Sequence, residues 1–273
     1  MSVTGDRRRR RRTIAAAIAG ATALALVLGV VAIVAVLRNR PVSTGCLVKV
    51  GSTSYAFDLD QAQNATTIAA VGRKLQMPDH AVTVALAAAL QESNLHNLAY
   101  GDRDSLGLFQ QRPSQGWGTA QQLQDPTYAA SAFYRALTRI ASWRSLPVTV
   151  AAQRVQRSAA PDAYAKWEPQ ARSLAIALTG EQGAAFACHY PIERTRATAP
   201  SYATALGRET GVNDLAGPFP GAQAWALASW LVGHASDYRI TSVTLQGRRW
   251  TASSGAWHHA STPEGGIQVE QGS

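Results

Sequence analysis

The sequence predicts a mainly α-helical protein with an N-terminal transmembrane helix, a helical domain with a short β-hairpin, and a small C-terminal α+β module. Three observations lead to this prediction. Residues 14–37 form an unbroken apolar run, helical patterns recur between residues 60 and 179, and short strand-like segments separated by glycine turns follow residue 240. The apolar content of 46% is too high for a disordered chain.

The positive charge of the chain is concentrated at its N-terminus. The first forty residues hold eight arginines and one acid, whereas the other 233 residues carry 18 basic and 16 acidic side chains, a net charge of only +2. A nucleic-acid-binding domain needs a basic face on its folded part. We therefore expect no nucleic-acid partner.

The apolar run at residues 14–37 is long enough to span a membrane. Its 24 residues carry no charge, and at about 1.5 Å per residue they cover about 36 Å as a helix. Six consecutive arginines precede the run and two follow it, so the positive-inside rule places an Arg-rich tail, residues 1–13, in the cytoplasm. A signal peptide has a shorter core and a clean cleavage site. We predict an uncleaved single-pass anchor in the cell membrane, with the following domains extracytoplasmic.

The two cysteines agree with this topology. Cys46 and Cys188 lie on the predicted exported side of the membrane, where disulfides persist. Two cysteines allow a single intramolecular pairing. We expect that disulfide rather than two unrelated buried thiols.

The exported part begins with a hairpin over residues 46–57. Helices are expected over residues 60–75, 79–93, 126–142, 147–158 and 161–179. The first begins at Asp60, with Gln63 at the spacing of a capping box, and Pro78 separates it from the second. Residues 97–120 are rich in Gly, Asp, Gln and Pro and predict a loop.

A polar linker, residues 191–200, divides the predicted domain 46–190 from the module 201–273. Within the module we expect helices over residues 201–209 and 221–237 and strands over residues 240–245, 249–252 and 267–269. The module contains several tryptophans, so a binding or packing role is its default interpretation.

One carboxylate occupies an unusual position. Glu92 closes a helix of small apolar residues and shares a face with Ala85, Ala88 and Ala89. Burial disfavours a charged carboxyl, and so does the partial negative charge at a helix C-terminus. We expect Glu92 to hold a proton near neutral pH, as a general acid must. The alternative is a solvated residue just after the helix.

This carboxylate belongs to the first of two motifs that are more specific together than either is alone. Glu92-Ser93 is followed about fifteen residues later by Gly107-Leu108-Phe109-Gln110. Over residues 46–188 the chain resembles the lysozyme-like superfamily, which includes lytic transglycosylases and goose-type lysozymes. In that family a Glu-Ser pair ends a buried helix, and a Gly-Leu-Met-Gln-like turn faces it across the glycan cleft. Phe109 stands where Met is usual.

The resemblance assigns roles to three residues. Glu92 would protonate the glycosidic oxygen. Ser93 would orient Glu92, and Gln110 would form part of the cleft wall and contact substrate. The longer string at residues 107–118 is similar to a membrane-anchored subfamily of exported actinobacterial proteins. The implied fold is an α-helical lysozyme-like domain.

A third family motif, small-small-Tyr-Asn-small-Gly at a helix end, is altered here. Its nearest match is residues 152–158, in which Val155 replaces the usual Tyr and Gln156 the usual Asn. By the resemblance Gln156 would contact substrate. Tyr164 could supply the missing hydroxyl, or it could be a core tyrosine.

Most glycosidases use two carboxylates, and Asp102 and Asp104 are the possible second ones. In such a loop aspartates are also common as turn formers or cation ligands. The transglycosylases that the chain resembles need only one Glu. It protonates the leaving oxygen and then accepts the proton of the sugar's own 6-hydroxyl, which gives a 1,6-anhydro product. Hydrolysis with Asp102 or Asp104 positioning a water is the second mechanism.

The sequence predicts no cofactor and no metal. The six histidines do not form a zinc-binding spacing, and no phosphate loop or dinucleotide fingerprint occurs. The expected partners are peptidoglycan glycan strands and the cell membrane. We predict a membrane-anchored enzyme that cleaves these strands; the alternative is a non-catalytic wall-binding or scaffold protein that retains the fold.

Overall fold

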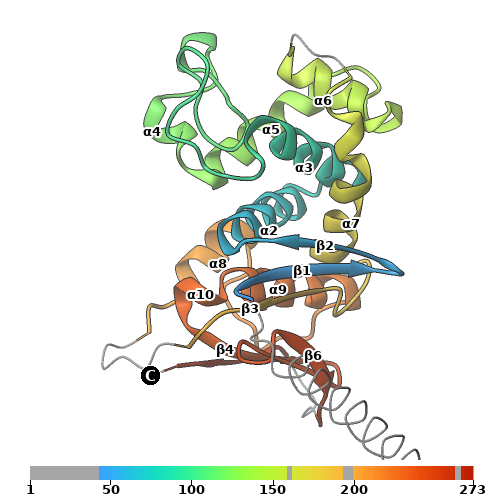
Figure 1. Cartoon of the computed structure of the whole chain (residues 1–273), viewed down its shortest axis with the longest axis vertical. Helices are drawn as coiled ribbons and strands as arrows, with labels where there is room; N and C mark the ends of the chain where they lie inside the picture. Colours follow the sequence, from blue (N-terminus) through green and yellow to red (C-terminus); the bar gives the residue numbers. More distant parts are fainter. Residues whose placement is uncertain (1–42, 159–161, 193–198, 262–265, 273) are drawn as a thin grey trace, which may run out of the picture. The chain divides into compact units, whose positions relative to one another are not determined.

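The computed structural model describes residues 43–158, 162–192, 199–261 and 266–272 (Figure 1). This part of the chain is a mixture of helices and two antiparallel sheets, and residues 43–273 form one compact unit. The predicted tail and membrane span, residues 1–37, lie outside the described residues. Within the described ranges no helix is both long and apolar enough to cross a bilayer.

The first sheet has three strands: β1 (Gly45–Val50), β2 (Thr53–Phe57) and β3 (Phe186–His189), in the order β2-β1-β3. The predicted hairpin is confirmed, but the third strand was not predicted. Cys46 and Cys188 face each other in the register of β1 and β3 and form a disulfide, as expected. This bond joins residues 142 positions apart in the sequence.

The first two helices are α2 (Leu59–Lys74) and α3 (Asp79–Ser93), close to their predicted bounds. The predicted cap of α2 is wrong: Asp58, rather than Asp60, accepts the N–H of Gln61 at 2.8 Å, and the Gln61 amide accepts the N–H of Asp58 at 3.0 Å. Asp58 and Gln61 have the same three-residue spacing as Asp60 and Gln63, so the pattern alone does not select the pair.

The remaining helices of this part are η1 (Pro113–Gln115), α4 (Ala120–Leu123), α5 (Pro126–Thr138), η2 (Trp143–Ser145), α6 (Val148–Gln156), η3 (Ala165–Trp167) and α7 (Glu168–Leu178). Helix α5 ends before the predicted residue 142, where Ser142 adopts a left-handed φ of 57°. Helix α7 begins seven residues later than predicted, with Pro169 in its first turn.

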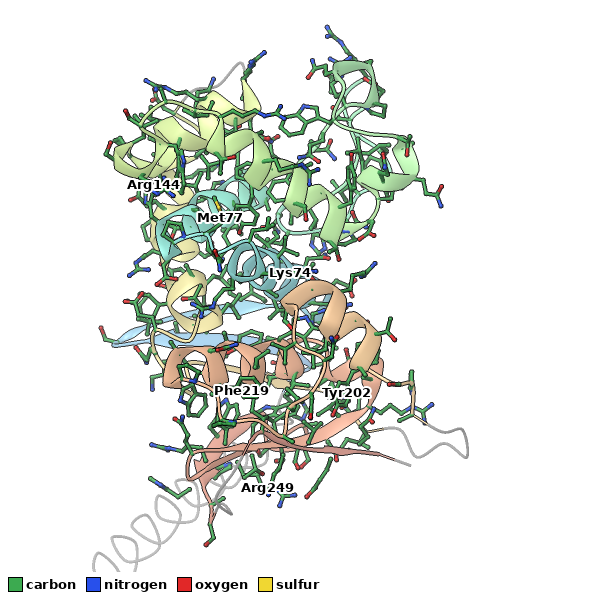
Figure 2. All side chains as sticks on the ribbon, turned by 180° about the vertical axis from the view of Figure 1, so that it is seen from behind. Lys74, Met77, Arg144, Tyr202, Phe219 and Arg249 are labelled. Carbon is green, nitrogen blue, oxygen red and sulfur yellow. A yellow bond between two sulfur atoms is a disulfide. The ribbon has the colours of Figure 1, made fainter. Side chains whose placement is uncertain are left out.

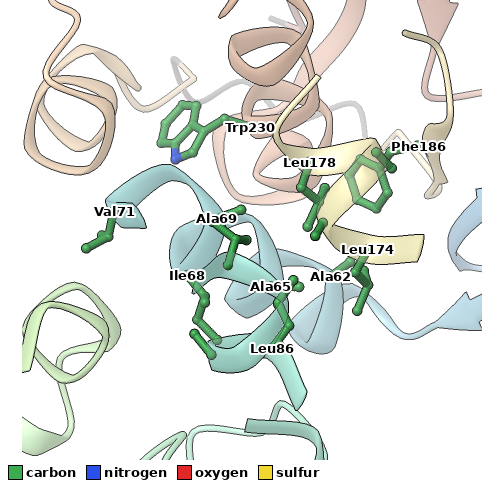
Figure 3. Packing of buried hydrophobic residues seen from close by; sticks show 14 of the residues in the cluster. Ala62, Ala65, Ile68, Ala69, Val71, Leu86, Leu174, Leu178, Phe186 and Trp230 are labelled. Carbon is green, nitrogen blue, oxygen red and sulfur yellow. The ribbon is translucent and has the colours of Figure 1, made fainter. Parts of the chain in front are cut away.

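Helix α2 lies in the middle of the hydrophobic core (Figure 3). Its buried residues include Ala62, Ala65 and Ile68, and it packs against α3, α5, α7 and α9. Helix α3 is buried from Ala81 to Leu90. A helix with apolar residues on all sides is stable only when other elements surround it, so α3 provides a rigid base for the residues at its C-terminus.

The C-terminal elements are α8 (Ala203–Thr210), α9 (Gly221–Gly233), α10 (Ala235–Tyr238), β4 (Ile240–Leu245), β5 (Arg248–Thr251), β6 (Ala256–His259) and β7 (Gln268–Gln271). The strands form a second sheet in the order β6-β5-β4-β7. The predicted helix over residues 221–237 is divided at His234, and β6 was not predicted. In β6 apolar and polar residues do not alternate, and both His258 and His259 are exposed, so its sequence lacks the pattern of a strand with one buried face.

Residues 201–273 pack directly against the first part of the chain. Helix α9 contacts α2, α7 and β3, and the indoles of Trp250 and Trp257 donate to the carbonyls of Cys188 and Phe186 at 3.0 and 2.8 Å. The Tyr190 hydroxyl donates to the Ile240 carbonyl at 2.6 Å. The predicted linker therefore separates segments that share one core.

A buried polar cluster joins α2, α8 and α9. The Glu209 carboxylate accepts from the Thr67 hydroxyl at 2.9 Å and from the Trp230 indole at 2.8 Å. The His234 ring lies 3.5 Å from the same carboxylate, and its Nδ1 lies 3.0 Å from the Trp230 carbonyl. Burial lowers the pKa of His234, although nearby Glu209 and Asp237 act in the opposite direction.

We expect the free energy of unfolding to fall as pH drops below about 6.5, the usual pKa of an unfolded histidine. The folded imidazole stays neutral at a pH at which the unfolded one is already protonated, so the unfolded state binds more protons. The loss has a slope of at most about 1.4 kcal/mol per pH unit. Urea unfolding between pH 7.5 and 5 measures it. His234→Gln should make the pH dependence shallower, and an unchanged slope would remove His234 as its source.

Candidate active site

A cleft of about 1060 Å³ opens at the C-terminal end of α3. Its walls come from the loop over residues 101–117, from α5 and from the end of α6. In Figure 1 the loop with α4 and the helix α6 stand on opposite sides of α3 and α5. The residues that line it include Glu92, Asp102, Gln110 and Gln156, so the structure brings four of the predicted site residues to one cavity.

Glu92 lies in the last turn of α3, half-buried and lining the cleft. The helix ends at the next residue, Ser93, because Asn94 adopts a left-handed φ of 52°, and the Asn94 N–H donates to the Leu90 carbonyl at 3.1 Å. The Tyr164 hydroxyl donates to Oε1 of Glu92 at 2.6 Å. This bond fixes one carboxyl oxygen and leaves Oε2 for a ligand in the cleft.

Tyr164 is both a core residue and a partner of Glu92. Its side chain is fully buried, yet its hydroxyl reaches the carboxyl at the edge of the cleft. Burial, followed by the bond to Glu92, raises the pKa of this tyrosine. The hydroxyl is therefore protonated at any physiological pH and acts as a donor. The short helix η3 adds a second contact with α3, because the Trp167 indole donates to the Gln91 side chain at 2.9 Å.

The turn over residues 107–110 lies against the end of α3. Gly107 has a φ of 74°, and a Cβ there would collide with the Leu123 carbonyl, so only glycine fits. Ser93 is buried, with its Oγ 2.8 Å from the Leu108 carbonyl and 3.1 Å from the Ala89 carbonyl. Ser93 therefore ties the helix end to the turn, and it is not among the described residues that line the cleft.

The two glutamines connect the walls of the cleft to the same turn. Gln110 adopts a left-handed φ of 47°, and its amide donates to the Tyr100 and Gly107 carbonyls at 3.3 Å. The Gln156 amide donates to the Phe109 carbonyl at 2.8 Å and so joins the end of α6 to the turn. Both side chains also line the cleft, which gives each a structural contact and a face toward a ligand.

Phe109 and Val155, two of the residues that depart from the expected motifs, are both packed into the core. Phe109 is buried and stacks on Phe133 with ring centroids 4.7 Å apart. Val155 is also buried and lines the cleft, so this position supplies no hydroxyl. The hydroxyl that reaches Glu92 comes from Tyr164 instead.

The two candidate second carboxylates differ in what they contact. Asp104 accepts from the Arg112 guanidinium at 2.6 Å and from the N–H and hydroxyl of Ser114 at 2.8 and 3.0 Å. The Ser114 N–H and then Arg112 hold the pKa of Asp104 well below its usual range. These contacts fix the loop. Asp102 lines the cleft with its side chain 91% exposed and lies 4.0 Å from the Arg103 guanidinium, so it is accessible to a ligand or a water.

Of the aromatic residues that could stack on sugars, Trp117 lines the cleft and Trp143 does not. Trp117 is half-buried and is held by the Tyr128 hydroxyl, which donates to its carbonyl at 3.1 Å. Trp143 is buried, and the guanidinium of Arg144, which is labelled in Figure 2, lies over its ring at 4.6 Å. Its role is therefore in packing.

Sequence reasoning missed a set of arginines on the cleft wall: Arg135, Arg139, Arg154 and Arg157. A signal was present, because the first two are four positions apart and the last two are three apart, so each pair shares one helix face. That signal does not show that the two faces meet at one cavity, because the meeting depends on how α5 packs against α6.

Within the described ranges no group of three or more His, Cys, Asp or Glu side chains is placed to hold a metal ion. The chain was compared with protein families and with curated proteins. No family model matches it, and no curated protein matches it.

Proposed function

We propose that this protein cleaves the glycan strands of peptidoglycan, as a membrane-anchored enzyme whose lysozyme-like domain faces the outside of the cell. One observation carries the proposal: a glutamate at the end of a buried helix lines a large cleft, with one carboxyl oxygen held by a buried tyrosine. The wall formed by Gln110 and Trp117 supports it, because amides and indole faces are common sugar contacts. The membrane anchor rests on the apolar run at residues 14–37.

Glu92 acts first as an acid and then as a base. Its proton passes to the glycosidic oxygen while the bond from that oxygen to C1 of the sugar breaks. The 6-hydroxyl of the same sugar then forms the new bond to C1 and gives its proton to Glu92. The products are a strand with a free 4-hydroxyl and a 1,6-anhydro sugar, and the enzyme regains its starting protonation state.

This one-carboxylate mechanism is favoured by the contacts of the two aspartates. Asp104 is already bound by Arg112 and Ser114, and Asp102 is highly exposed. A nucleophile or a base that orients a single water needs a fixed position. Hydrolysis through Asp102 is the second mechanism, and it differs in its product, which is a reducing sugar.

A non-catalytic wall-binding protein is the second candidate function. Val155, which lines the cleft where the family motif has a hydroxyl, favours it. The same cleft would then bind the strand without breaking it.

The deciding experiment uses the full-length chain in a mild detergent and purified peptidoglycan. Mass spectrometry of the soluble products measures both whether muropeptides are released and whether they end in a 1,6-anhydro sugar. Release of anhydro products supports the proposal, reducing ends point to hydrolysis, and strand binding without release supports the non-catalytic function.

Tyr164→Phe is expected to lower the rate of release about tenfold or more without unfolding the chain. The change removes only the hydroxyl that donates to Glu92. That bond strengthens as Glu92 gives up its proton and becomes a carboxylate in the transition state, and a hydrogen bond to a charged group is worth about 1.5–3 kcal/mol. Tyr190→Phe is a matched control, because Tyr190 is also buried and its hydroxyl bonds to a carbonyl far from the cleft. Equal rates for the two variants would contradict a role for Tyr164.

A further inference from the structure

The basic residues on the cleft wall are all arginines. Within the described part of the chain the cleft is lined by two carboxylates, Glu92 and Asp102, and by five guanidinium groups. The arginines come from three elements: the loop (Arg112), the end of α5 (Arg135 and Arg139) and the end of α6 (Arg154 and Arg157). The wall therefore carries an excess of positive charge, although the exported part as a whole is nearly neutral.

Three of these arginines have no acidic partner among the described residues: Arg139, Arg154 and Arg157. All three are exposed. The other two are engaged, because Arg112 pairs with Asp104 at 2.6 Å and Arg135 lies over the Tyr128 ring at 5.7 Å.

A favourable interaction with the helix dipole explains part of this placement. Cations near a helix C-terminus are stabilised by its partial negative charge, and α5 and α6 both end in basic residues. Arg208 also lies near a helix C-terminus, that of α8, but it has an acidic partner, Asp125, at 3.1 Å. A helix C-terminus therefore does not by itself explain why three guanidinium groups that line one cavity have no acidic partner among the described residues.

The chemistry of these groups points to an anionic ligand. A guanidinium binds a carboxylate or a phosphate through two parallel hydrogen bonds, which lysine does not match. A cleft lined by one sign of charge also concentrates the opposite charge from solution. A neutral glycan alone would leave Arg139, Arg154 and Arg157 with nothing to pair with.

We propose that Arg139, Arg154 and Arg157 form a subsite for anionic substituents of the glycan strand that occupies the cleft. The inference rests on the proposed function for the identity of the strand. The anions are the carboxylates of its stem peptides or the phosphates of polymers attached to it. In the cleft, these groups flank the sugar that lies beside Glu92, so the arginines select a decorated strand over a bare one.

The test is a sedimentation assay with the full-length chain carrying Glu92→Gln, which keeps the strand intact during the measurement. The probes are purified peptidoglycan, the same material treated with hydrofluoric acid to remove phosphodiester-linked polymers, and the same material whose stem-peptide carboxylates are converted to neutral amides with a carbodiimide and ammonia, which leaves the cross-linked material insoluble. The treatment that weakens binding identifies the anion. If neither treatment weakens it, the subsite does not exist.

A triple variant, Arg139→Gln/Arg154→Gln/Arg157→Gln, is compared with Arg144→Gln/Arg248→Gln/Arg249→Gln. The second set removes the same charge from residues that do not line the cleft; Arg144 and Arg249 are labelled in Figure 2. We expect the cleft variant to bind untreated peptidoglycan at least about tenfold more weakly, since it loses three charge-assisted pairs at once. The difference should shrink as salt is added.

Equal affinities of the two triple variants would overturn the subsite. The result is independent of catalysis, because both variants carry Glu92→Gln. A chain with Glu92 intact that binds decorated strands and releases no muropeptides would overturn the proposed enzyme and leave the subsite standing.

Discussion

Glu92→Gln is expected to lower the rate of muropeptide release by at least about 100-fold, the lower range for losing a positioned general acid. Glutamine has nearly the same shape and its carbonyl oxygen can still accept from Tyr164, so the cleft keeps its geometry. What disappears is the proton that passes to the glycosidic oxygen. In the one-carboxylate mechanism the same residue also acts as the base, so both steps fail together.

The matched control is Glu168→Gln. Glu168 is exposed in the first turn of α7 and is not a cleft residue. Its loss should leave the rate within about twofold of the parent chain, because exposed single charges contribute little. Thermal unfolding curves of both variants should match the parent. A Glu92→Gln chain that still releases muropeptides at the parent rate would exclude Glu92 as the acid.

Asp102→Asn separates the two mechanisms further. If Glu92 alone carries both proton transfers, removing the exposed Asp102 carboxylate leaves the 1,6-anhydro product unchanged. If Asp102 positions a water, the same variant loses the reducing-end product. The identity of the product therefore decides between the mechanisms even when the overall rates are similar.

Helix positions were predictable from the sequence where periodicity and proline agree. Helix α3 has the predicted bounds, because Pro78 precedes it and its apolar stripe runs to Leu90. The errors fall where tertiary contacts decide the structure. Helix α9 ends at His234, whose ring is buried against Glu209, and strand β3 is four residues long and exists because β1 pairs with it.

The candidate site was predictable from the sequence only where its residues belong to a local pattern. Glu92 and Gln110 could be singled out, because a carboxylate at an apolar helix end and a glycine-led turn leave local signals. The contact of the Tyr164 hydroxyl with Glu92 joins residues 72 positions apart, and nothing local distinguishes this tyrosine from a core residue. The cleft arginines of α5 and α6 could not be predicted either, because they come to one cavity only when the two helices pack together.

The disulfide should make a large contribution to stability. Cys46→Ala/Cys188→Ala is expected to lower the free energy of unfolding by about 2–5 kcal/mol, because the bond closes a loop of 142 residues and restricts the unfolded chain. Urea unfolding of the full-length chain measures the change. The parent chain with a reducing agent should lose a similar amount, since both treatments remove the same link.

Removal of this bond should change stability without changing the rate of strand cleavage. The bond lies between β1 and β3, which pair along four positions without it, so the folded sheet retains its ladder. Glu92 is held by α3 and Tyr164, and neither of them belongs to the sheet. Below the unfolding transition, the rate per folded molecule of the Cys46→Ala/Cys188→Ala chain should therefore equal that of the parent. A loss of less than about 1 kcal/mol would contradict the loop-closure account, and a lower rate in the folded state would show that the bond also shapes the cleft.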